Sequence, residues 1–334
     1  GNLSVALLLT EADVRALLTM PVALEAVEAA FRRLADGTGK VEPRHRLHLE
    51  GFSYLHYMAA ADGAGGYEGL KIYTSSREGL RFMIPLFRAK TGELLAILEG
   101  DFLGQMRTGA ATGLATRLLA REDARIVGII GTGLQAKTQL EASVAVQKIE
   151  RIRAFGRNAE RRESFAREMT AKLRVPVEAV ASAEAAVRDA EILVTVTTAV
   201  TPVAESRWVR PGTHINAVGA NFPQKRELDS ETVMRAGAIF VDSCEQAKME
   251  AGDLIQSFQE TQSRWDGVKE LAQLVAGRTA GRTSPDQITL FKSSGIAIED
   301  IVTAGKVYEL ALERKLGKQA SFWEADGARE RTAS

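Results

Sequence analysis

Hydrophobic residues recur with helical spacing near both ends of the chain. Near the start they predict helices over Glu11–Leu18 and Pro21–Leu34, the second ended by glycine at Gly37. Near the end they predict one long helix over Ile296–Leu316. The residues from Gly317 onward are mostly polar, and we expect them to fray.

Between these helices the apolar residues fall in short, often alternating runs that glycines and polar turns separate. This pattern predicts antiparallel strands. The runs are Phe52–Ala60, Leu70–Thr74, Phe82–Phe87 and Leu94–Glu99. A helix is predicted to follow over Phe102–Leu119, with Asp101 as its N-terminal cap and Arg107 and Thr108 in its early turns.

From Arg125 onward, short apolar strands alternate with helices. The predicted strands are Arg125–Ile130, Arg151–Phe155, Ile192–Thr197, His214–Val218, Ala238–Asp242 and Ile288–Phe291. One predicted helix follows the first of these strands and ends at about Gln147. Two more cover Ala159–Leu173 and Ala183–Ala190. Such alternation is typical of a parallel sheet that helices cover on both faces. The segment Met249–Asp253 is interpreted as a helix end at Gly252 with no catalytic role.

These patterns predict the fold class α/β, with a Rossmann-type doubly wound parallel sheet inserted in a second, α+β domain. We expect the inserted domain at residues 125–295. The other domain is then formed by residues 1–124 together with 296–334.

The composition narrows the possible function classes. The 334 residues carry 43 Lys plus Arg and 43 Asp plus Glu, and this balance argues against a general nucleic-acid binder. The one cysteine, Cys244, excludes an internal disulfide framework and indicates a reducing, cytoplasmic compartment. No apolar run reaches the roughly 20 residues that cross a bilayer, and the histidines lack metal-binding spacing. We therefore expect no membrane, nucleic-acid or metal partner.

The segment GTGLQA at residues 131–136 matches the dinucleotide-binding pattern G-x-G-x-x-G/A. It follows a predicted strand and opens a predicted helix, which is the context that the pattern requires. The helix N-terminus supplies free N–H groups and a partial positive charge for a pyrophosphate. The residues expected to hold the dinucleotide here are Gly131, Thr132, Gly133, Leu134 and Gln135.

The end of the second strand bears on which dinucleotide binds. An NAD enzyme usually places an acidic residue there for the ribose 2′-hydroxyl. Here the strand is followed by Arg157 and Asn158, with Arg161 and Arg162 close behind. A guanidinium pairs with a 2′-phosphate that a carboxylate would repel, so we predict NADP(H) in preference to NAD(H). The alternative is that Arg157 is a solvated turn residue.

Further motifs occur in order along the chain. They are Gly69-Leu70-Lys71, Met106-Arg107-Thr108-Gly109-Ala110-Ala111, the glycine turn, His214-Ile215-Asn216-Ala217-Val218-Gly219 and Phe291-Lys292-Ser293-Ser294-Gly295. Together, these five motifs resemble those of the ornithine cyclodeaminase/μ-crystallin family, and the resemblance covers about residues 8–316. The resemblance implies a homodimer in which the first domain binds substrate and dimerises around the inserted Rossmann domain.

The resemblance also implies roles for individual residues. Lys71 corresponds to the family's active-site lysine, and Arg107 to the arginine that binds the substrate carboxylate. Arg44 corresponds to a second carboxylate arginine, with Arg46 as the alternative. The residues implied to line the cofactor are Thr108, Thr195, Thr197 and Val218. Ser294 precedes the last helix and is read either as its cap or as a cofactor contact.

One position departs from the family pattern. Ornithine cyclodeaminase has an aspartate in the loop after the His214–Val218 strand, where Asn221 stands in this chain. An asparagine cannot accept a proton or offer a carboxylate to an ammonium group. Asn221 therefore argues against cyclodeamination of ornithine, and the arginine after the second strand points the same way.

A 2-imino acid or cyclic ketimine carries a carboxylate beside a C=N bond. Arginine forks suit the carboxylate, and a nicotinamide supplies the hydride. Protonation of the nitrogen makes the carbon electrophilic, and Lys71, with a pKa lowered by nearby arginines, is the candidate proton donor. Asn221 is the candidate hydrogen-bond partner of the nitrogen.

The sequence thus predicts an NAD(P)H-dependent enzyme that reduces a small imino acid, such as Δ1-pyrroline-2-carboxylate to proline. One alternative is an ornithine cyclodeaminase or alanine dehydrogenase. The other is a non-catalytic, μ-crystallin-like protein that binds NADPH and a small ligand.

Overall fold

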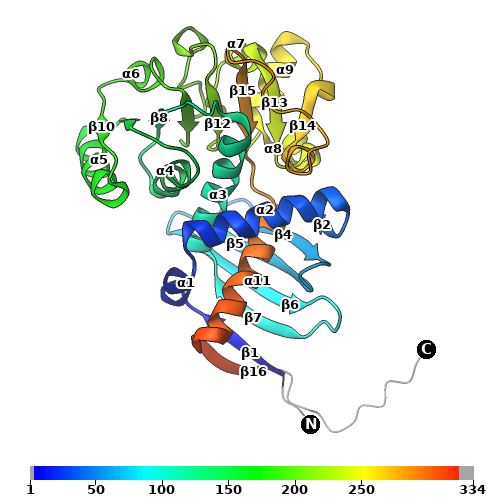
Figure 1. Cartoon of the computed structure of the whole chain (residues 1–334). Helices are drawn as coiled ribbons and strands as arrows, with labels where there is room; N and C mark the ends of the chain where they lie inside the picture. The colour runs from blue at the N-terminus through cyan, green and yellow to red at the C-terminus, as the bar shows by residue number, and fades with distance from the viewer. Residues whose placement is uncertain (1–3, 323–334) are drawn as a thin grey trace.

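Two eight-stranded sheets organise residues 4–322, the part of the chain that the computed structural model describes (Figure 1). The first sheet is mixed, and the second is entirely parallel and built from the middle of the chain. The predicted α/β fold, with a Rossmann-type sheet inserted in an α+β domain, is confirmed.

The first sheet runs in the order β16-β1-β7-β6-β5-β4-β2, and β3 also pairs with β4. All of its neighbouring strands are antiparallel except β1 and β7. Its strands are β1 (Ser4–Leu9), β2 (Gly39–Val41), β3 (His45–His48), β4 (Tyr54–Asp62), β5 (Tyr67–Ser76), β6 (Gly79–Arg88), β7 (Leu94–Glu99) and β16 (Lys318–Phe322).

Helices cover one face of this sheet. They are α1 (Glu11–Leu17), α2 (Met20–Asp36), α3 (Asp101–Leu119) and α11 (Ala297–Arg314). Figure 1 shows α2 and α11 crossing in front of the strands. Their apolar stripes pack on the inward side chains of the sheet, so that Phe31, Met58 and Ile301 share one buried core.

The second sheet has the strand order β10-β9-β8-β11-β12-β15-β13-β14. Its strands are β8 (Ile126–Ile130), β9 (Arg151–Phe155), β10 (Val177–Ala179), β11 (Ile192–Thr195), β12 (His214–Ala217), β13 (Ala236–Val241), β14 (Val268–Glu270) and β15 (Ile288–Lys292). The chain order reverses between β8 and β11. In open parallel sheets a ligand binds at such a reversal, beyond the carboxyl ends of the strands.

The second sheet is accompanied by seven helices in the described part of the chain. They are α4 (Leu134–Val146), α5 (Ala159–Leu173), α6 (Ala183–Val187), α7 (Ser230–Arg235), α8 (Cys244–Glu250), α9 (Gly252–Thr261) and α10 (Leu271–Val275). We retain residues 125–295 as the proposed inserted domain because every strand of this sheet lies within that range. None of the helices in residues 4–322 has the length and hydropathy of a membrane span.

The expected fraying after Gly317 is wrong for the residues that directly follow. Lys318–Phe322 form β16, which pairs antiparallel with β1 at the edge of the first sheet. Neither strand was predicted from the sequence, because the polar residues of β16 gain their order from a partner more than 300 residues away. Residues 323–334 lie outside the described part of the chain.

Two predicted helix caps are also wrong. Asp101 lies inside the first turn of α3, and the carboxylate of Glu11 accepts hydrogen bonds from the N–H groups of Asp101 and Phe102 instead. Gly252 does not end a helix: α8 ends at Glu250 and α9 begins at Gly252. The break between these helices directs Glu250 into the interior, where it is 1% exposed.

Candidate active site

A cavity of about 620 Å³ lies between the two sheets and is lined by residues of both. Many residues singled out in the sequence meet on its walls. They are Arg44, Lys71, Arg107, Thr108, Gly133, Leu134, Gln135, Thr197, Val218, Asn221 and Ser294. Arg44 lines this cavity and Arg46 does not, so the geometry favours Arg44 of the two candidate carboxylate arginines.

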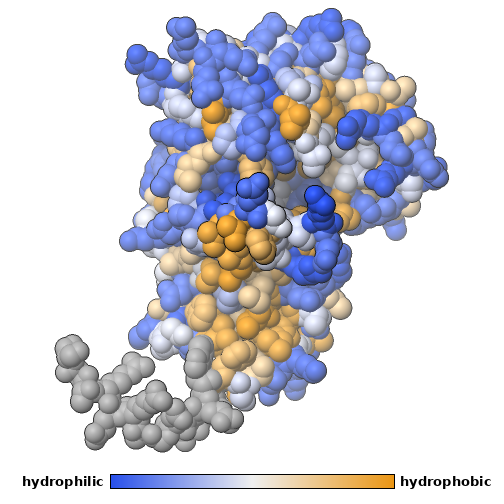
Figure 2. All heavy atoms as spheres, turned by 180° about the vertical axis from the view of Figure 1, so that it is seen from behind, coloured by the Kyte–Doolittle hydropathy of each residue, from blue (hydrophilic) through white to orange (hydrophobic). Residues whose placement is uncertain are grey.

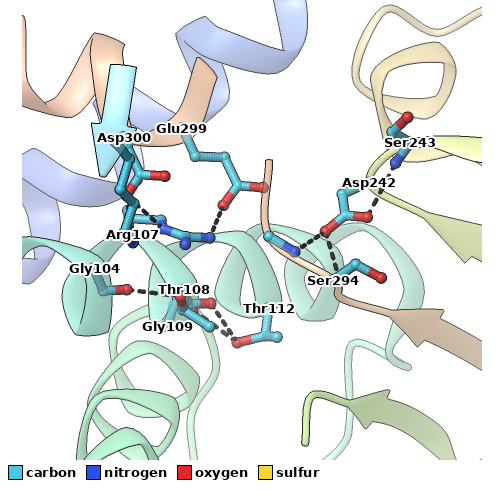
Figure 3. A network of polar contacts seen from close by, with 12 residues as sticks. Gly104, Arg107, Thr108, Gly109, Thr112, Asp242, Ser243, Ser294, Glu299 and Asp300 are labelled. Atoms are coloured by element: carbon cyan, nitrogen blue, oxygen red, sulfur yellow. Dashed lines mark hydrogen bonds and ion pairs between the residues drawn. The ribbon is translucent and has the colours of Figure 1, made fainter. Parts of the chain in front are cut away.

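Two of the lining residues, Lys71 and Arg107, belong to a buried polar cluster around Asp300, at the start of α11. Oδ1 of Asp300 accepts hydrogen bonds from Nζ of Lys71 and from Nε of Arg107, each at 3.0 Å. Nη1 of Arg107 donates to Glu299 at 2.8 Å. Figure 3 shows the guanidinium held between the two carboxylates. No hydrogen bond or ion pair within residues 4–322 engages Nη2 of Arg107, which leaves this donor for a ligand.

Burial and charge adjust the titration of this cluster. Burial, reinforced by the nearby charge of Arg107, lowers the pKa of Lys71 to about 8 against the opposing effect of Asp300. Burial raises the pKa of Glu299 to about 8, although Arg107 opposes it. Burial opposes the charge of Arg107, but Asp300 and Glu299 hold the pKa of that guanidinium above its usual range. Lys71 is therefore protonated at neutral pH and can release its proton near pH 8.

A second buried cluster joins the two domains at the side of the cavity. Nη1 of Arg44 and Nη2 of Arg46 donate to opposite oxygens of Glu250. Nη2 of Arg44 also donates to the carbonyl oxygens of Ser294 and Gly295, at 3.1 and 3.2 Å. Both Nη atoms of Arg44 are thus engaged by protein, so Arg44 offers a ligand mainly its charge.

Sequence reasoning missed Glu250, whose segment was interpreted as a helix end without a role. No sequence pattern indicates that Glu250 is buried, because a glutamate at the end of a short helix is usually solvated. Replacing Glu250 with glutamine leaves the buried guanidinium of Arg44 and the partly buried one of Arg46 without their counter-charge. We expect this variant to lose about 3–5 kcal/mol of unfolding free energy.

Urea unfolding measures this loss. Glu184→Gln is the matched control, because it removes a carboxylate that pairs with Arg188 where the two side chains are 42% and 63% exposed. We expect the control to change the unfolding free energy by less than about 1 kcal/mol. Equal stability of the two variants would contradict the role assigned to Glu250.

The cofactor side of the cavity is formed by the turn between β8 and α4. Gly131 has φ 117°, and a Cβ there would lie 2.4 Å from the carbonyl oxygen of Val196, so only glycine fits. Gly133 and Leu134 are exposed at the N-terminus of α4, where a Cβ on Gly133 meets nothing within 4 Å. This open helix N-terminus, with its unpaired N–H groups, fits a dinucleotide pyrophosphate.

The remaining predicted cofactor residues lie off the cavity wall. Thr132 packs against Gly156 at the end of β9, which brings the following Arg157 close to the glycine turn. Arg157 is exposed, and no hydrogen bond or ion pair within residues 4–322 engages it. Asn158 caps α5 by accepting a hydrogen bond from the N–H of Arg161 at 2.8 Å. These positions leave Arg157 free for a group on the adenosine ribose.

Thr195 is placed differently from its prediction. It is fully buried, and its hydroxyl donates to Glu227 at 2.9 Å. Ser294 lines the cavity, and its N–H donates to Asp242 at 2.7 Å, as Figure 3 shows. Within residues 4–322, no group of His, Cys, Asp and Glu side chains is arranged to hold a metal ion.

The fold and the cavity define a class of protein: a dinucleotide-binding oxidoreductase whose substrate side presents arginines and a lysine to a small carboxylic acid. The profile of the ornithine cyclodeaminase/mu-crystallin family matches residues 4–315. The chain belongs to this family.

Individual relatives agree with this assignment. A Δ1-pyrroline-2-carboxylate reductase of Bacillus cereus is 40% identical over 262 residues, which span 76% of this chain and 80% of the relative. The structure of the Thermococcus litoralis Δ1-pyrroline-2-carboxylate reductase in complex with NADH and L-proline superimposes with a TM-score of 0.90 at 40% identity, over 93% of this chain and 99% of that one. An archaeal alanine dehydrogenase dimer with bound NAD has a TM-score of 0.90 at 35% identity, over 96% and 100% of the two chains.

Proposed function

We propose that this protein reduces a cyclic 2-imino acid, with Δ1-pyrroline-2-carboxylate as its first candidate substrate, using a reduced nicotinamide dinucleotide. One observation supports this proposal most strongly: no hydrogen bond or ion pair within residues 4–322 engages Nη2 of Arg107. Arg107 and Lys71 line the same cavity as the dinucleotide turn. The reductases of Bacillus cereus and Thermococcus litoralis support the choice of substrate.

The residues of the cavity divide the work of the reaction. The substrate carboxylate binds Nη2 of Arg107 and lies in the positive field of Arg44. Lys71 donates its proton to the imine nitrogen, which makes the adjacent carbon electrophilic. The bound nicotinamide supplies the hydride. The side chain of Asn221, which no hydrogen bond within residues 4–322 engages, hydrogen-bonds the nitrogen without adding a charge.

Aromatic side chains form the wall beyond Lys71. Tyr73, Phe82 and Phe222 line the cavity, and Nζ of Lys71 lies 5.2 Å from the centre of the Phe82 ring. Burial, together with Arg46 and Arg44, lowers the pKa of the adjacent His56 to about 4, so this side chain is neutral. Such a wall suits an apolar ring better than the second ammonium group of ornithine.

Oxidation of NADPH or NADH, followed at the absorbance of the reduced nicotinamide, tests the proposal. We expect turnover with Δ1-pyrroline-2-carboxylate or its six-membered homologue, with proline or pipecolate as product. Turnover only with pyruvate plus ammonia would favour an alanine dehydrogenase, and proline formation from ornithine would favour a cyclodeaminase. Cofactor binding without turnover of any of these would favour a binding protein.

We propose that NADPH is preferred to NADH because Arg157 is exposed near the glycine turn and residues 156–159, directly after β9, include no acidic residue. We expect Arg157→Ala to lower kcat/KM for NADPH by about 10- to 100-fold and to leave the value for NADH nearly unchanged. Arg167→Ala, at an exposed arginine of α5, is the control. A wild-type protein that uses NADH better than NADPH would refute the preference.

We also propose that the protein is a homodimer that pairs through the outer face of its first sheet. Figure 2 shows hydrophobic side chains on this face, opposite the one that α2 and α11 cover. Tyr57 and Met83 flank Ile72 in register, and each is 42% exposed. An apolar patch of this kind marks a protein interface. The alanine dehydrogenase dimer supports the proposal.

We expect Ile72→Lys to convert the dimer into a monomer, because it places a charge in the middle of the apolar interface. Light scattering after size-exclusion chromatography measures the mass. Leu312→Lys, at a 53% exposed position of α11, should remain dimeric. A monomeric wild-type protein would contradict the proposal. We further propose a cytoplasmic location, because a single free cysteine, Cys244, is typical of a protein from a reducing compartment.

A further inference from the structure

A buried glutamate lies behind the cavity wall, between the ends of β11 and β12. Glu227 is 0% exposed, and its Oε1 accepts a hydrogen bond from the N–H of Thr197 at 2.6 Å. Its Oε2 accepts from the N–H of Gly219 at 2.7 Å and from the hydroxyl of Thr195 at 2.9 Å. One carboxylate thus joins the backbones that follow two neighbouring strands.

Those two backbones approach each other closely. A Cβ on Gly219 would lie 2.1 Å from the carbonyl oxygen of Thr197 and 2.5 Å from Oε1 of Glu227. Any side chain at position 219 would therefore push the two strand ends apart. Both Thr197 and Gly219 line the cavity, whereas Glu227 does not.

Glu227 is itself held on both sides by the chain. Its N–H donates to Oδ1 of Asp253 at 2.6 Å, and its carbonyl oxygen accepts from the N–H of Val203 at 2.7 Å. Nζ of Lys292 lies 3.4 Å from Oδ2 of Asp253 and donates to the carbonyl oxygen of Ala217 at 3.3 Å. Burying these charged groups is costly, and their hydrogen bonds fix one geometry for the surrounding backbone.

The position of this cluster relates it to one half of the dinucleotide. The glycine turn after β8 receives the pyrophosphate, and the end of β9 lies on the adenosine side. The ends of β11 and β12 lie on the other side of β8, where the nicotinamide half extends toward Lys71. Thr197 and Gly219 therefore belong to the nicotinamide subsite.

We propose that Glu227 is a positioning residue for the nicotinamide ring: by fixing the backbones of Thr197 and Gly219, it shapes the wall on which the ring lies. This inference rests on the nicotinamide-dependent reduction proposed above. Glu227 touches neither substrate nor cofactor, and it acts only through the two backbone segments that it joins.

Comparing two ligands in Glu227→Gln separates this role from a general structural one. A glutamine turns an N–H donor toward at least one of the donors that the carboxylate accepts. We expect the dissociation constant of the reduced dinucleotide that wild type prefers to rise by about 10- to 100-fold. The constant for the matching fragment without nicotinamide, ADP-ribose or its 2′-phosphate, should change by less than about twofold.

Equal weakening of both ligands would overturn the proposal, and so would unchanged binding of the dinucleotide. Glu260→Gln, on the neighbouring helix α9 and outside the cavity lining, is the matched control and should bind both ligands as wild type does. If the glutamine variant does not fold, Glu227→Asp enters the same comparison, because its shorter carboxylate cannot reach both N–H groups. Failure of wild type to bind either ligand would instead refute the proposed function.

Discussion

Replacing Lys71 with methionine lowers kcat for imine reduction by about 10²- to 10⁴-fold and leaves cofactor affinity unchanged. Methionine keeps the buried apolar stem but cannot deliver a proton to the imine nitrogen. The side chain is buried on the floor of the cavity and faces the substrate region, with only Asp300 as a hydrogen-bond partner in the described residues. Steady-state kinetics and fluorescence titration with the reduced dinucleotide measure the two quantities.

The pH dependence of the same reaction identifies Lys71 as the donor. Its pKa is lowered to about 8, mainly by burial and then by Arg107. The protonated amine is the active form in reduction, so kcat should stay level below pH 8 and fall above it. The methionine variant should lose this fall, whereas Lys137→Met, at an amine paired with Glu168 on the surface, should keep it. Undiminished turnover of Lys71→Met would remove Lys71 from the mechanism.

Replacing Arg107 with methionine should lower kcat/KM by about 10³-fold or more, because the substrate loses both its carboxylate anchor and its alignment with Lys71. We expect most of the loss in KM, with a further decrease in kcat. Arg107→Lys should not restore activity, because one ammonium cannot bond Glu299, Asp300 and a substrate in the geometry of a guanidinium.

Arg107→Met should also lower the free energy of unfolding by about 3–5 kcal/mol, because Asp300 would remain buried without one of its partners. Urea unfolding measures this loss. Arg117→Met is the control on the same helix α3, since Arg117 is 43% exposed and pairs with Glu28 on the surface. Its kinetics and stability should match those of wild type. An Arg107→Met variant with normal KM would exclude Arg107 as the carboxylate anchor.

Local patterns were sufficient for much of the fold. The alternation of strands and helices from Arg125 predicts a parallel sheet, and the glycine turn lies at the end of β8 as expected. The motifs also pointed to Lys71 and Arg107, which the structure brings to a single carboxylate oxygen of Asp300. The strands, helices and glycine turn depend on short stretches of sequence, so local patterns are enough to find them. The roles of Lys71 and Arg107 came instead from the resemblance of their motifs to a known family, because a lysine on a strand or an arginine in a helix is otherwise a surface residue.

Contacts between distant segments could not be predicted in this way. Glu250 is paired with Arg44 and Arg46, which lie 206 and 204 residues away. Glu227 supports two loops that only the parallel pairing of β11 and β12 brings together. In both cases a polar residue has a solvated surface position as its simplest interpretation, and only the tertiary fold removes that possibility.

A crystal structure of the protein with its reduced or oxidised dinucleotide and L-proline tests the central claim most directly. We expect the proline carboxylate within hydrogen-bond distance of Nη2 of Arg107, the ring nitrogen beside Nζ of Lys71, and the proline Cα facing C4 of the nicotinamide. A complex in which Arg107 and Lys71 contact neither ligand, with proline bound elsewhere, would contradict the account.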